Sequence, residues 1–419
     1  MKILSKYLLN KTYNTVIYGG ITAIICCGRR KSCQNLKNEK IVFRKMKILN
    51  LIWGFTLGAG IDKCYLTYAK LGEVDPDVEV RSVCINLMNL NSHIESLREI
   101  GTEFIDIKSR KDFSWVGKLK SLIDSEQPDV VFTHGFNGAI MMLIERFLKG
   151  MRTTVVCTYH GAYHAPTLSK KLIEPLYNGL MVFVYKHIAK KVICVENVSR
   201  HYLCDKGVEK DKVVTVHNGI LDIAKPAPVD LSAYVSLDAP IIVTASRITG
   251  VKGLPHLLKA LKLLKDKGVK FHYFMIGEGP DLEALKNQAK ELGLNDDITF
   301  GGFQSNIPEW LAACDIFALP SLYEYHSIAV LEAMRAGKAI VATTVGGNGE
   351  SITDGIEGLL VPPSDSIALA DALRKLLSDR ALRERLGQNA RNRFEKEFTE
   401  TAMMMGLVNV FKSISSTES

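Results

Sequence analysis

The sequence lacks the cysteine spacings that mark a metal site or a disulfide framework. Its nine cysteines are scattered, with Cys26 and Cys27 adjacent and no C-x-x-C anywhere in the chain. Disulfide frameworks are typical of much shorter secreted chains, and zinc sites need closely spaced cysteine or histidine pairs. The pattern therefore predicts reduced thiols in a cytoplasmic protein, with no metal site.

The chain also has little excess charge outside its first residues. The net charge is +8, but residues 1–45 hold ten lysines and arginines against one acid, Glu39. That segment carries +9, which leaves −1 for residues 46–419. Proteins that bind nucleic acid usually carry a basic patch on the folded domain. The neutral body therefore predicts no nucleic-acid partner.

No apolar run in residues 1–45 is long enough to cross a bilayer. The most apolar stretch, Tyr13–Cys27, has about 15 residues, whereas a membrane-spanning helix needs about 20. No A-x-A-like cleavage site follows, as a signal peptide would require. Two interpretations stay open, a basic peripheral anchor or a segment before the real start. Because Met46–Asn50 has the pattern of a first β-strand, we expect residues 1–45 to be an extension outside the core fold.

The length of 419 residues indicates two domains. From Met46 onward, short apolar runs alternate with amphipathic stretches, a pattern typical of parallel sheets covered by helices. Residues 224–240 hold three prolines and little periodicity, which predicts a linker over 224–239. We therefore predict an α/β fold with two doubly wound Rossmann-like domains facing a cleft, over 46–223 and 240–398. A C-terminal helix within 399–419 is expected to pack back on the first domain.

The expected strands are Lys47–Gly54, Val78–Asn86, Glu103–Ile107, Asp129–His134, Thr153–His160, Lys191–Glu196, Lys212–His217, Pro240–Ser246, Phe271–Gly277, Ile298–Gly302, Ile316–Pro320, Lys338–Thr344 and Gly358–Val361. The expected helices are Ser114–Gln127, Leu168–Ala189, Gly253–Lys267, Asp281–Leu292, Ile307–Cys314, Ile328–Ala336, Ser366–Ser378, Arg380–Glu397 and Glu400–Ile414.

The most informative segment lies between the expected strand Ile316–Pro320 and the helix that follows it. Glu324 and Glu332 stand eight residues apart, one after the strand and one inside the helix. If the helix begins near Ser327, the amides of His326 to Ala329 are free to bind a diphosphate. A carboxylate in this position can accept hydrogen bonds from the two hydroxyls of a ribose.

Two cations follow the neighbouring expected strand. Arg247 and Lys252 come just after Pro240–Ser246. Arginine offers a fork of donors to phosphate oxygens and lysine a point charge. In open parallel sheets, ligands bind beyond the carboxyl ends of the strands. The sequence therefore predicts a diphosphate site formed by these two cations and the helix amides.

These residues belong to an ordered set of motifs that covers about 120 residues. The chain has Arg247, Lys252 and Gly253, then Gly277-Glu278-Gly279-Pro280, then Glu324 and Glu332. It continues with Gly346-Gly347 and Glu350, and then with Gly358–Pro363 and Asp365. The set resembles the donor domain of the family-4 retaining glycosyltransferases, which have the GT-B fold. Tyr325 and His326 depart from the family pattern, in which glycine is commoner at the first position and a small or apolar residue usual at the second.

The first half of the chain resembles the same family more loosely. Gly58 and Gly60 lie in a segment similar to its glycine-rich first turn, and Thr158–Gly161 resembles its strand-end histidine segment. Val216–Ile220 resembles its interdomain segment. His134 and His164 are alternatives to His160 as the histidine that faces the substrate.

The resemblance implies roles for the site residues. Arg247 and Lys252, with the helix start at His326, Ser327 and Ile328, would hold the donor diphosphate, and Glu332 the ribose. Glu324 would bind hydroxyls of the transferred sugar, and His160 would reach that sugar from the opposite domain; these two are the expected catalytic residues. Gly58, Gly60, Gly277 and Gly279 would form loops at the donor and acceptor sites.

The resemblance also implies a reaction and its partners. A sugar would pass with retention from a UDP- or GDP-sugar to a glycan or lipid-linked acceptor, without a metal or other cofactor. Enzymes of this type often serve lipopolysaccharide, capsule or exopolysaccharide synthesis at the cytoplasmic face of the inner membrane, so peripheral membrane contact is a further expectation. The alternatives are a nucleotide-sugar epimerase and a non-catalytic sugar-nucleotide-binding protein. The sugar, nucleotide, acceptor, linkage and oligomeric state are not specified by the sequence.

Overall fold

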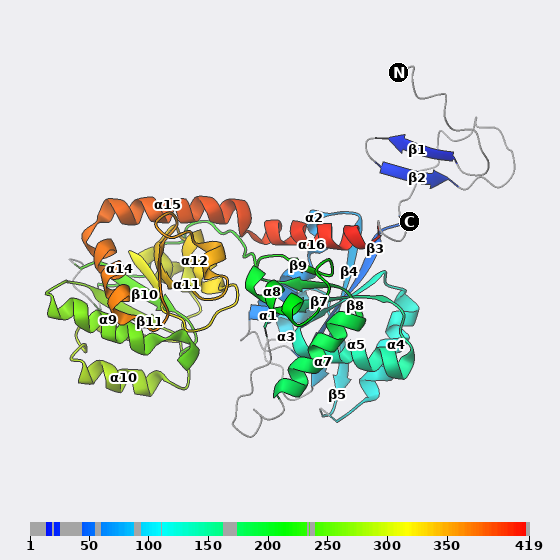
Figure 1. Ribbon diagram of the computed structural model, residues 1–419, viewed down its shortest axis with the longest axis horizontal. Coiled ribbons are helices and arrows are strands. Elements are labelled where there is room, and N and C mark those ends of the chain that lie inside the picture. The colour runs from blue at the N-terminus through cyan, green and yellow to red at the C-terminus, as the bar shows by residue number, and fades with distance from the viewer. Residues whose placement is uncertain are drawn as a thin grey trace, which may run out of the picture. The chain divides into compact units, whose positions relative to one another are not determined.

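The computed structural model (Figure 1) describes residues 14–18, 21–25, 44–54, 60–87, 94–109, 111–161, 174–232, 234 and 239–415. The chain divides into two compact units, Met1–Arg44 and Lys45–Ser419. In the first unit, β1 (Asn14–Tyr18) pairs antiparallel with β2 (Ile21–Ile25). The second unit contains two domains, each built on a parallel sheet. Within the described residues, no helix has both the length and the apolar character to cross a bilayer.

The first domain has a seven-stranded parallel sheet in the order β5-β4-β3-β6-β7-β8-β9. Its elements are β3 (Met46–Trp53), α1 (Gly60–Tyr68), α2 (Leu71–Val74), β4 (Val78–Leu87), α3 (Ile94–Glu99), β5 (Glu103–Ile107), α4 (Ser114–Glu126), β6 (Val130–His134), α5 (Gly135–Lys149), β7 (Thr154–Tyr159), α7 (Glu174–His187), β8 (Ala189–Cys194), α8 (Asn197–Asp205) and β9 (Val213–Thr215).

The second domain has a six-stranded parallel sheet in the order β12-β11-β10-β13-β14-β15. Its elements are β10 (Ile241–Ala245), the 3₁₀ turn η2 (Gly250–Lys252), α9 (Leu254–Asp266), β11 (His272–Ile276), α10 (Leu282–Glu291), β12 (Ile298–Gly302), α11 (Ile307–Ala313), β13 (Ile316–Leu319), α12 (Ile328–Arg335), β14 (Ala339–Thr343), α13 (Asn348–Ser351), β15 (Leu359–Val361), α14 (Ser366–Ser378) and α15 (Arg380–Glu397). A last helix, α16 (Glu400–Ser415), follows.

Helices cover both faces of each sheet, which explains why several strands are buried along their whole length. Every residue of β6, β10, β11, β13 and β14 is buried. A strand with a helix layer on each face has no solvent-facing side, so it needs apolar residues at both alternating positions. The two helices after β15 begin at side-chain caps: Asp365 accepts from the amides of Ile367 and Ala368, and Asp379 accepts from that of Leu382.

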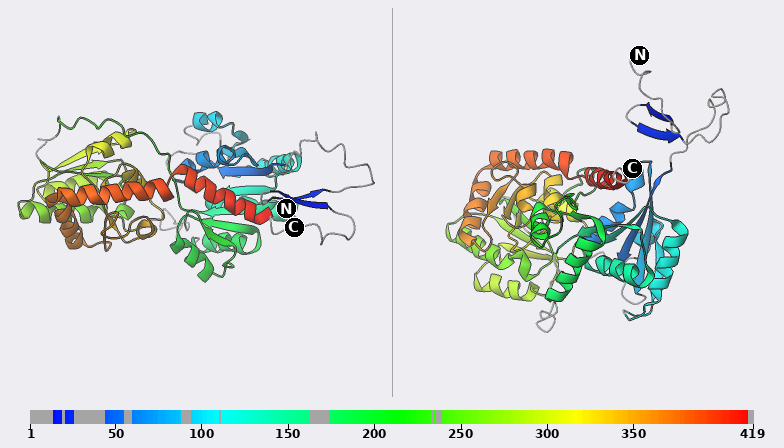
Figure 2. Two further views of the ribbon diagram at one scale, coloured as in Figure 1. Left: turned by 90° about the horizontal axis from the view of Figure 1, so that it is seen from above. Right: turned by 45° about the vertical axis from the view of Figure 1, so that its right-hand side comes forward.

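The last two helices connect the domains, as the orange and red ribbons of Figure 2 show. Helix α15 packs on the second domain, where Phe394 and Phe398 enter the core. Helix α16 packs on the first domain, where Leu407 and Phe411 contact a cluster that includes Phe132 of β6. Thr67 of α1 donates to Glu400 at 2.7 Å, which adds a polar link at the start of α16.

The structure corrects some expected boundaries in the first domain. The strand expected at Lys191–Glu196 begins two residues earlier, at Ala189, because the preceding helix ends at His187. The strand expected at Lys212–His217 is only Val213–Thr215. His217 leaves the sheet and bonds to Glu350 of the second domain. The expected helix at Leu168–Ala189 is described from Glu174, and its earlier part lies outside the described residues.

Candidate active site

The predicted donor residues lie where the order of the second sheet reverses. Strand β10 pairs with β11 on one side and with β13 on the other. The chain leaves β10 toward β11 but leaves β13 toward β14, so the two connections diverge at the carboxyl ends of the strands. Divergent connections of this kind leave a crevice in which ligands bind. Arg247 and Lys252 follow β10, and Glu324 follows β13, so both connections at this point carry charged side chains.

Lys252 and Glu324 form an ion pair across these connections. The Lys252 Nζ atom lies 2.5 Å from Glu324 Oε1, and the two side chains are 14% and 11% exposed. Ser321 Oγ donates to the same oxygen at 2.7 Å. Glu324 Oε2 has no bonding partner within the described residues. One oxygen is therefore fixed by the protein, and the other is free to accept from a ligand hydroxyl.

Glycines bring the loops of this site close together. A Cβ atom at Gly277 would lie 1.9 Å from the Ser246 carbonyl oxygen, and one at Gly279 would lie 2.0 Å from the Ile248 carbonyl oxygen. Gly253 has φ +62°, and a Cβ atom there would lie 2.1 Å from the Pro320 carbonyl oxygen. Only glycine tolerates these approaches. Gly277 and Gly279 thus hold the loop that carries Arg247, whose exposed side chain makes no ion pair within the described residues.

Helix α12 begins at this crevice with unsatisfied amides. The amide groups of His326, Ser327, Ile328 and Ala329 donate to no acceptor within the part of the chain that the structure describes. The first turn of a helix always leaves such donors, and together with the helix dipole they favour an anion. Glu332 lies one turn after Ile328, on the same side of the helix, and is half-buried.

The His326 side chain is buried and bonds to another side chain of its own domain, which its place in the motif did not indicate. Its Nε2 atom lies 3.0 Å from Ser351 Oγ, and its ring stacks on His217 at 4.9 Å. Burial lowers the pKa of His326 to about 3, so the imidazole is neutral at physiological pH. His326 can therefore offer a diphosphate its amide but no cationic side chain.

On the first domain, the structure distinguishes His160 from His134. The ring nitrogens of His134 bond to Thr158 Oγ1 at 3.0 Å and to Asn50 Oδ1 at 2.7 Å, so both are occupied. His160 follows β7, and its buried Nε2 atom has no hydrogen-bond partner within the described residues. Burial lowers the pKa of His160 to about 4, which keeps the ring neutral. Of these two histidines, His160 is the one with a nitrogen left for a ligand.

The other predictions for the first domain are less informative. Gly60 is the first residue of α1, whereas Gly58 and His164 lie outside the described residues. Gly60 therefore marks the start of the helix after β3, at the point where the first sheet also changes direction between β3 and β6.

The structure adds an interdomain network that the sequence did not reveal. Glu350 of α13 accepts from the amide of Asn197 at 2.7 Å and from His217 Nε2 at 2.8 Å. It thereby caps the start of α8 from the opposite domain. Burial raises the pKa of Glu350, but hydrogen bonds from His217 and the Asn197 amide outweigh it and leave the pKa below its usual value.

Glu196, at the carboxyl end of the first sheet, was also missed. It is 2% exposed; Ser199 donates to its Oε1 atom at 2.8 Å, and its Oε2 atom has no partner within the described residues. Burial, with smaller contributions from Glu350 and Glu324, raises the pKa of Glu196 to about 7. No local feature of the sequence marks this residue, because its burial depends on the second domain.

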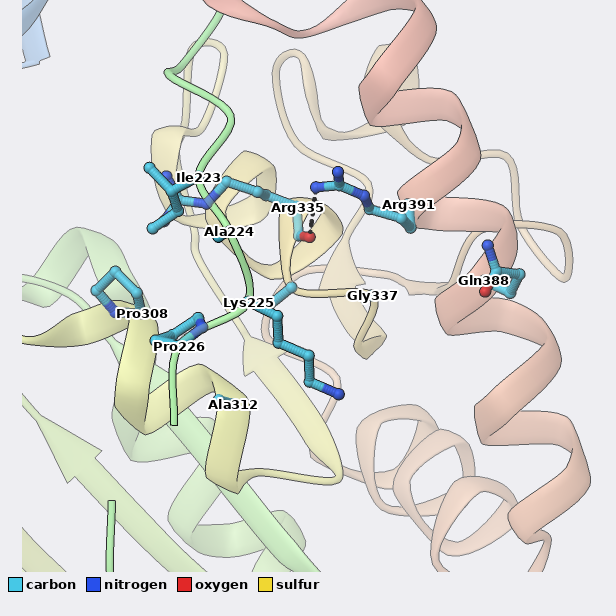
Figure 3. Close-up of a pocket in the computed structure, with 11 residues that line it drawn as sticks. Ile223, Ala224, Lys225, Pro226, Pro308, Ala312, Arg335, Gly337, Gln388 and Arg391 are labelled. Carbon is cyan, nitrogen blue, oxygen red and sulfur yellow. Dashed lines mark hydrogen bonds between the residues drawn. The ribbon is translucent and has the colours of Figure 1, made fainter. Parts of the chain in front are cut away.

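A separate hollow of about 370 Å³ lies between the start of the linker and the second domain (Figure 3). Ile223–Pro226 of the linker form one wall, and Arg335 and Arg391 contribute to the others. Arg391 is neutralised by Asp222, and Arg335 donates to the Leu221 carbonyl. None of the predicted site residues lines this hollow. It therefore does not coincide with the crevice at β10 and β13.

The fold and the crevice define a class of protein. Two doubly wound parallel domains whose sheet ends face each other form the GT-B arrangement of glycosyltransferases. Residues 234–393 match the family described as "Glycosyl transferases group 1", and residues 93–221 match "Glycosyltransferase Family 4". The chain belongs to this group 1 and family 4 set of glycosyltransferases.

Individual relatives agree with that assignment. The α-D-kanosaminyltransferase of Streptomyces kanamyceticus is 32% identical over 179 residues, or 42% of this chain and 46% of that protein. The chain thus spans about half the length of this relative. The UDP-Gal:α-D-GlcNAc-diphosphoundecaprenol α-1,3-galactosyltransferase of Escherichia coli is 26% identical, over 69% of this chain and 76% of its own. The crystal structure of Anabaena Alr3699/HepE in complex with UDP matches in fold, with a TM-score of 0.71, 20% identity, and 88% and 100% of the two chains covered.

Proposed function

We propose that this chain transfers a sugar, with retention of configuration, from a UDP- or GDP-sugar to a glycan or lipid-linked acceptor. The observation that carries the proposal is the meeting of Lys252, Glu324 and the free amides of α12 at the β10/β13 crevice. A nucleoside diphosphate sugar presents an anion next to hydroxyl groups. The crevice offers a cation and amide donors next to a carboxylate, so the two are complementary in charge and hydrogen bonding.

Each residue then has a task in the reaction. The diphosphate would bind the amides of Ser327 and Ile328, with Arg247 and Lys252 supplying positive charge. Glu332 would accept from the ribose hydroxyls. These groups stabilise the charge that develops on the departing diphosphate, and each well-placed donor of this kind is typically worth about 3 kcal/mol.

The sugar itself would lie between Glu324 and His160. Glu324 Oε2 would accept from its hydroxyls, and the neutral His160 would hydrogen-bond to it from the first domain. We propose front-face attack: the acceptor oxygen bonds to the anomeric carbon on the side from which the diphosphate leaves. The leaving phosphate oxygen takes the acceptor proton, so no covalent glycosyl-enzyme forms.

The acceptor proposal rests on the relatives and on one surface. Relatives act in lipopolysaccharide core and amylovoran biosynthesis, and the Escherichia coli relative is named for a diphosphoundecaprenol-linked acceptor. Phe147 and Leu148, at the end of α5, are 68% and 69% exposed, and the exposed cations Lys149 and Arg152 follow them. Apolar side chains beside cations suit the surface of an anionic membrane. We propose peripheral contact with the cytoplasmic face of the membrane through this end of α5.

The membrane proposal is tested by sedimentation with phosphatidylcholine vesicles, with and without phosphatidylglycerol. The wild type should sediment with the anionic vesicles, and the F147S/L148S double variant, which keeps the basic residues 1–45, should sediment less. Phe303→Ser, which removes a 71% exposed aromatic from the other domain, is the control. Equal sedimentation of all three proteins would exclude this surface.

The donor proposal is tested by a thermal-shift and calorimetric screen of UDP, GDP and their sugars. The cognate nucleotide should raise the melting temperature, and Glu332→Ala should weaken every nucleotide that binds, because all share the ribose. Glu291→Ala, at an exposed position on α10, is the matched control. Failure of every nucleoside diphosphate to bind the wild type would refute the proposed function.

A further inference from the structure

The residue after Glu324 reaches across to the first domain. The Tyr325 ring lies so close to Gly161 that a Cβ atom there would be 1.9 Å from its Cζ atom and 2.2 Å from its hydroxyl oxygen. Gly161 has φ +132°, a conformation that other residues rarely adopt. The contact is therefore between a tyrosine ring of one domain and bare backbone of the other.

Aromatic side chains surround this contact. The Tyr325 ring meets that of Tyr159 edge-on, with centroids 6.5 Å apart, and that of Tyr323 edge-on at 5.0 Å. Tyr159 is the last residue of β7, and Tyr323 belongs to the β13–α12 loop. Aromatic pairs in this geometry contribute about 0.5–1.5 kcal/mol beyond their burial. The ring thus has a defined place, against Tyr159 on one domain and Tyr323 on its own.

The loop that carries Tyr325 is fixed along its backbone. The Gly347 amide donates to the Tyr325 carbonyl at 2.7 Å, and Asn218 Nδ2 donates to the His326 carbonyl at 3.0 Å. A Cβ atom at Gly346 would lie 1.9 Å from the Glu324 carbonyl oxygen. Because the backbone is held from three directions, movement of the Tyr325 ring relative to Gly161 is transmitted to Glu324.

We propose that Tyr325 is a positioning residue that sets the place of Glu324 relative to His160. It is covalently next to Glu324, and the backbone it contacts is covalently next to His160. These two side chains lie on different domains and, under the proposed function on which this inference rests, hold the same sugar. A displacement of about 1 Å in such a pair is enough to cost about 100-fold in rate.

The test measures donor turnover separately from nucleotide binding. The probes are UDP-glucose and GDP-mannose, whose slow hydrolysis in the absence of acceptor is followed by release of UDP or GDP. Tyr325→Ala should lower kcat by about 10- to 100-fold, with the Kd for the free nucleoside diphosphate changed by less than about threefold, since no phosphate contact is lost. Tyr325→Phe keeps the ring and loses only the hydroxyl group, so it should restore most of the rate. Phe303→Ala controls for the loss of an aromatic residue from the same domain.

A double-mutant cycle distinguishes positioning from general destabilisation. Gly161→Ala should displace the ring and lower kcat as Tyr325→Ala does, and the G161A/Y325A double variant should be no worse than the more affected single variant. Additive losses, or a Tyr325→Ala enzyme as fast as the wild type, would overturn the inference while leaving the proposed function intact. A wild type that binds neither UDP nor GDP would overturn both. Melting curves of each variant identify any that fail to fold.

Discussion

The side chains at the carboxyl ends of the two sheets differ in charge and in burial. At the second sheet, the crevice holds a cation, an ionised pair and free amides: Arg247, the Lys252–Glu324 pair and the start of α12. At the first sheet, burial disfavours the charged forms of the titratable side chains. Burial lowers the pKa of His160 to about 4 and raises that of Glu196 to about 7. The second domain is thus suited to a diphosphate, and the first to uncharged hydroxyl groups.

The most severe test of this contrast is Glu324→Gln. The change keeps the shape but removes the charge that pairs with Lys252, so we expect sugar transfer to be abolished. Front-face attack further predicts that intact-mass spectrometry of the variant, incubated with donor, shows no added sugar. Glu283→Gln, on an exposed side chain of α10, should leave turnover unchanged. A trapped glycosyl-enzyme would refute the proposed mechanism.

Loss of the Lys252 cation should have the next largest effect on turnover. Lys252→Ala removes one donor to the departing diphosphate, and we expect turnover to fall by about 100- to 1,000-fold. It also leaves the poorly exposed Glu324 carboxylate without its partner, which should lower the melting temperature. Lys259→Ala, at an exposed position on α9, is the comparison. Equal activity of the two variants would place the diphosphate elsewhere.

Substitutions of His134 and of His160 should differ in whether they reduce mainly stability or mainly turnover. His134→Ala leaves Thr158 and Asn50 without their buried partner, so the free energy of unfolding should fall by about 2–4 kcal/mol. His160→Ala loses no hydrogen bond within the described residues, so its free energy of unfolding should fall less than that of His134→Ala, while turnover falls. Chemical denaturation and donor turnover, measured on both variants, check this. The reverse pattern would make His134 the substrate-facing residue.

The smallest effect concerns Glu196 and pH. Its pKa rises from 4.5 to about 7, chiefly through burial, so the folded chain keeps a proton that the unfolded chain loses. Folding stability from this group is therefore lost as pH rises from 4.5 to 7. Glu196→Gln removes that dependence. It should be more stable than the wild type at pH 8 by about 1–2 kcal/mol, since water screens part of the full shift, and the gap should narrow toward pH 5.

Denaturant titrations at both pH values measure this difference. Glu209→Gln, an exposed glutamate of the same domain, should show no such change. Stability curves for Glu196→Gln and the wild type that stay parallel across this pH range would show that the carboxyl is ionised in the folded protein.

Most of the fold could be predicted from the sequence because its signals are local. Strands such as β11 and β14 have apolar residues at four of their five positions, and Asp365 and Asp379 mark the starts of α14 and α15. The predictions were weaker where the second domain decides the outcome. The strand expected at Lys212–His217 ends early because His217 bonds across to Glu350.

The same distinction holds for the site. Arg247, Lys252, Glu324 and Glu332 could be proposed from motifs, because each motif lies in one connection of one sheet. The burial of Glu196 and the contact of Tyr325 with Gly161 could not, because both depend on residues more than 100 positions away. His326 shows the limit of a motif, since its buried ring is held by Ser351 and is neutral, which leaves its amide as the group that can bind an anion.

The central claim is that the start of α12 holds a diphosphate, and amide hydrogen exchange tests it most directly. Exchange over residues 320–335 is measured for the protein alone, with uridine, and with UDP, and again with guanosine and GDP. One of the diphosphates should slow exchange at Ser327, Ile328 and Ala329, and the matching nucleoside should not. A diphosphate that binds without protecting these amides would contradict the claim.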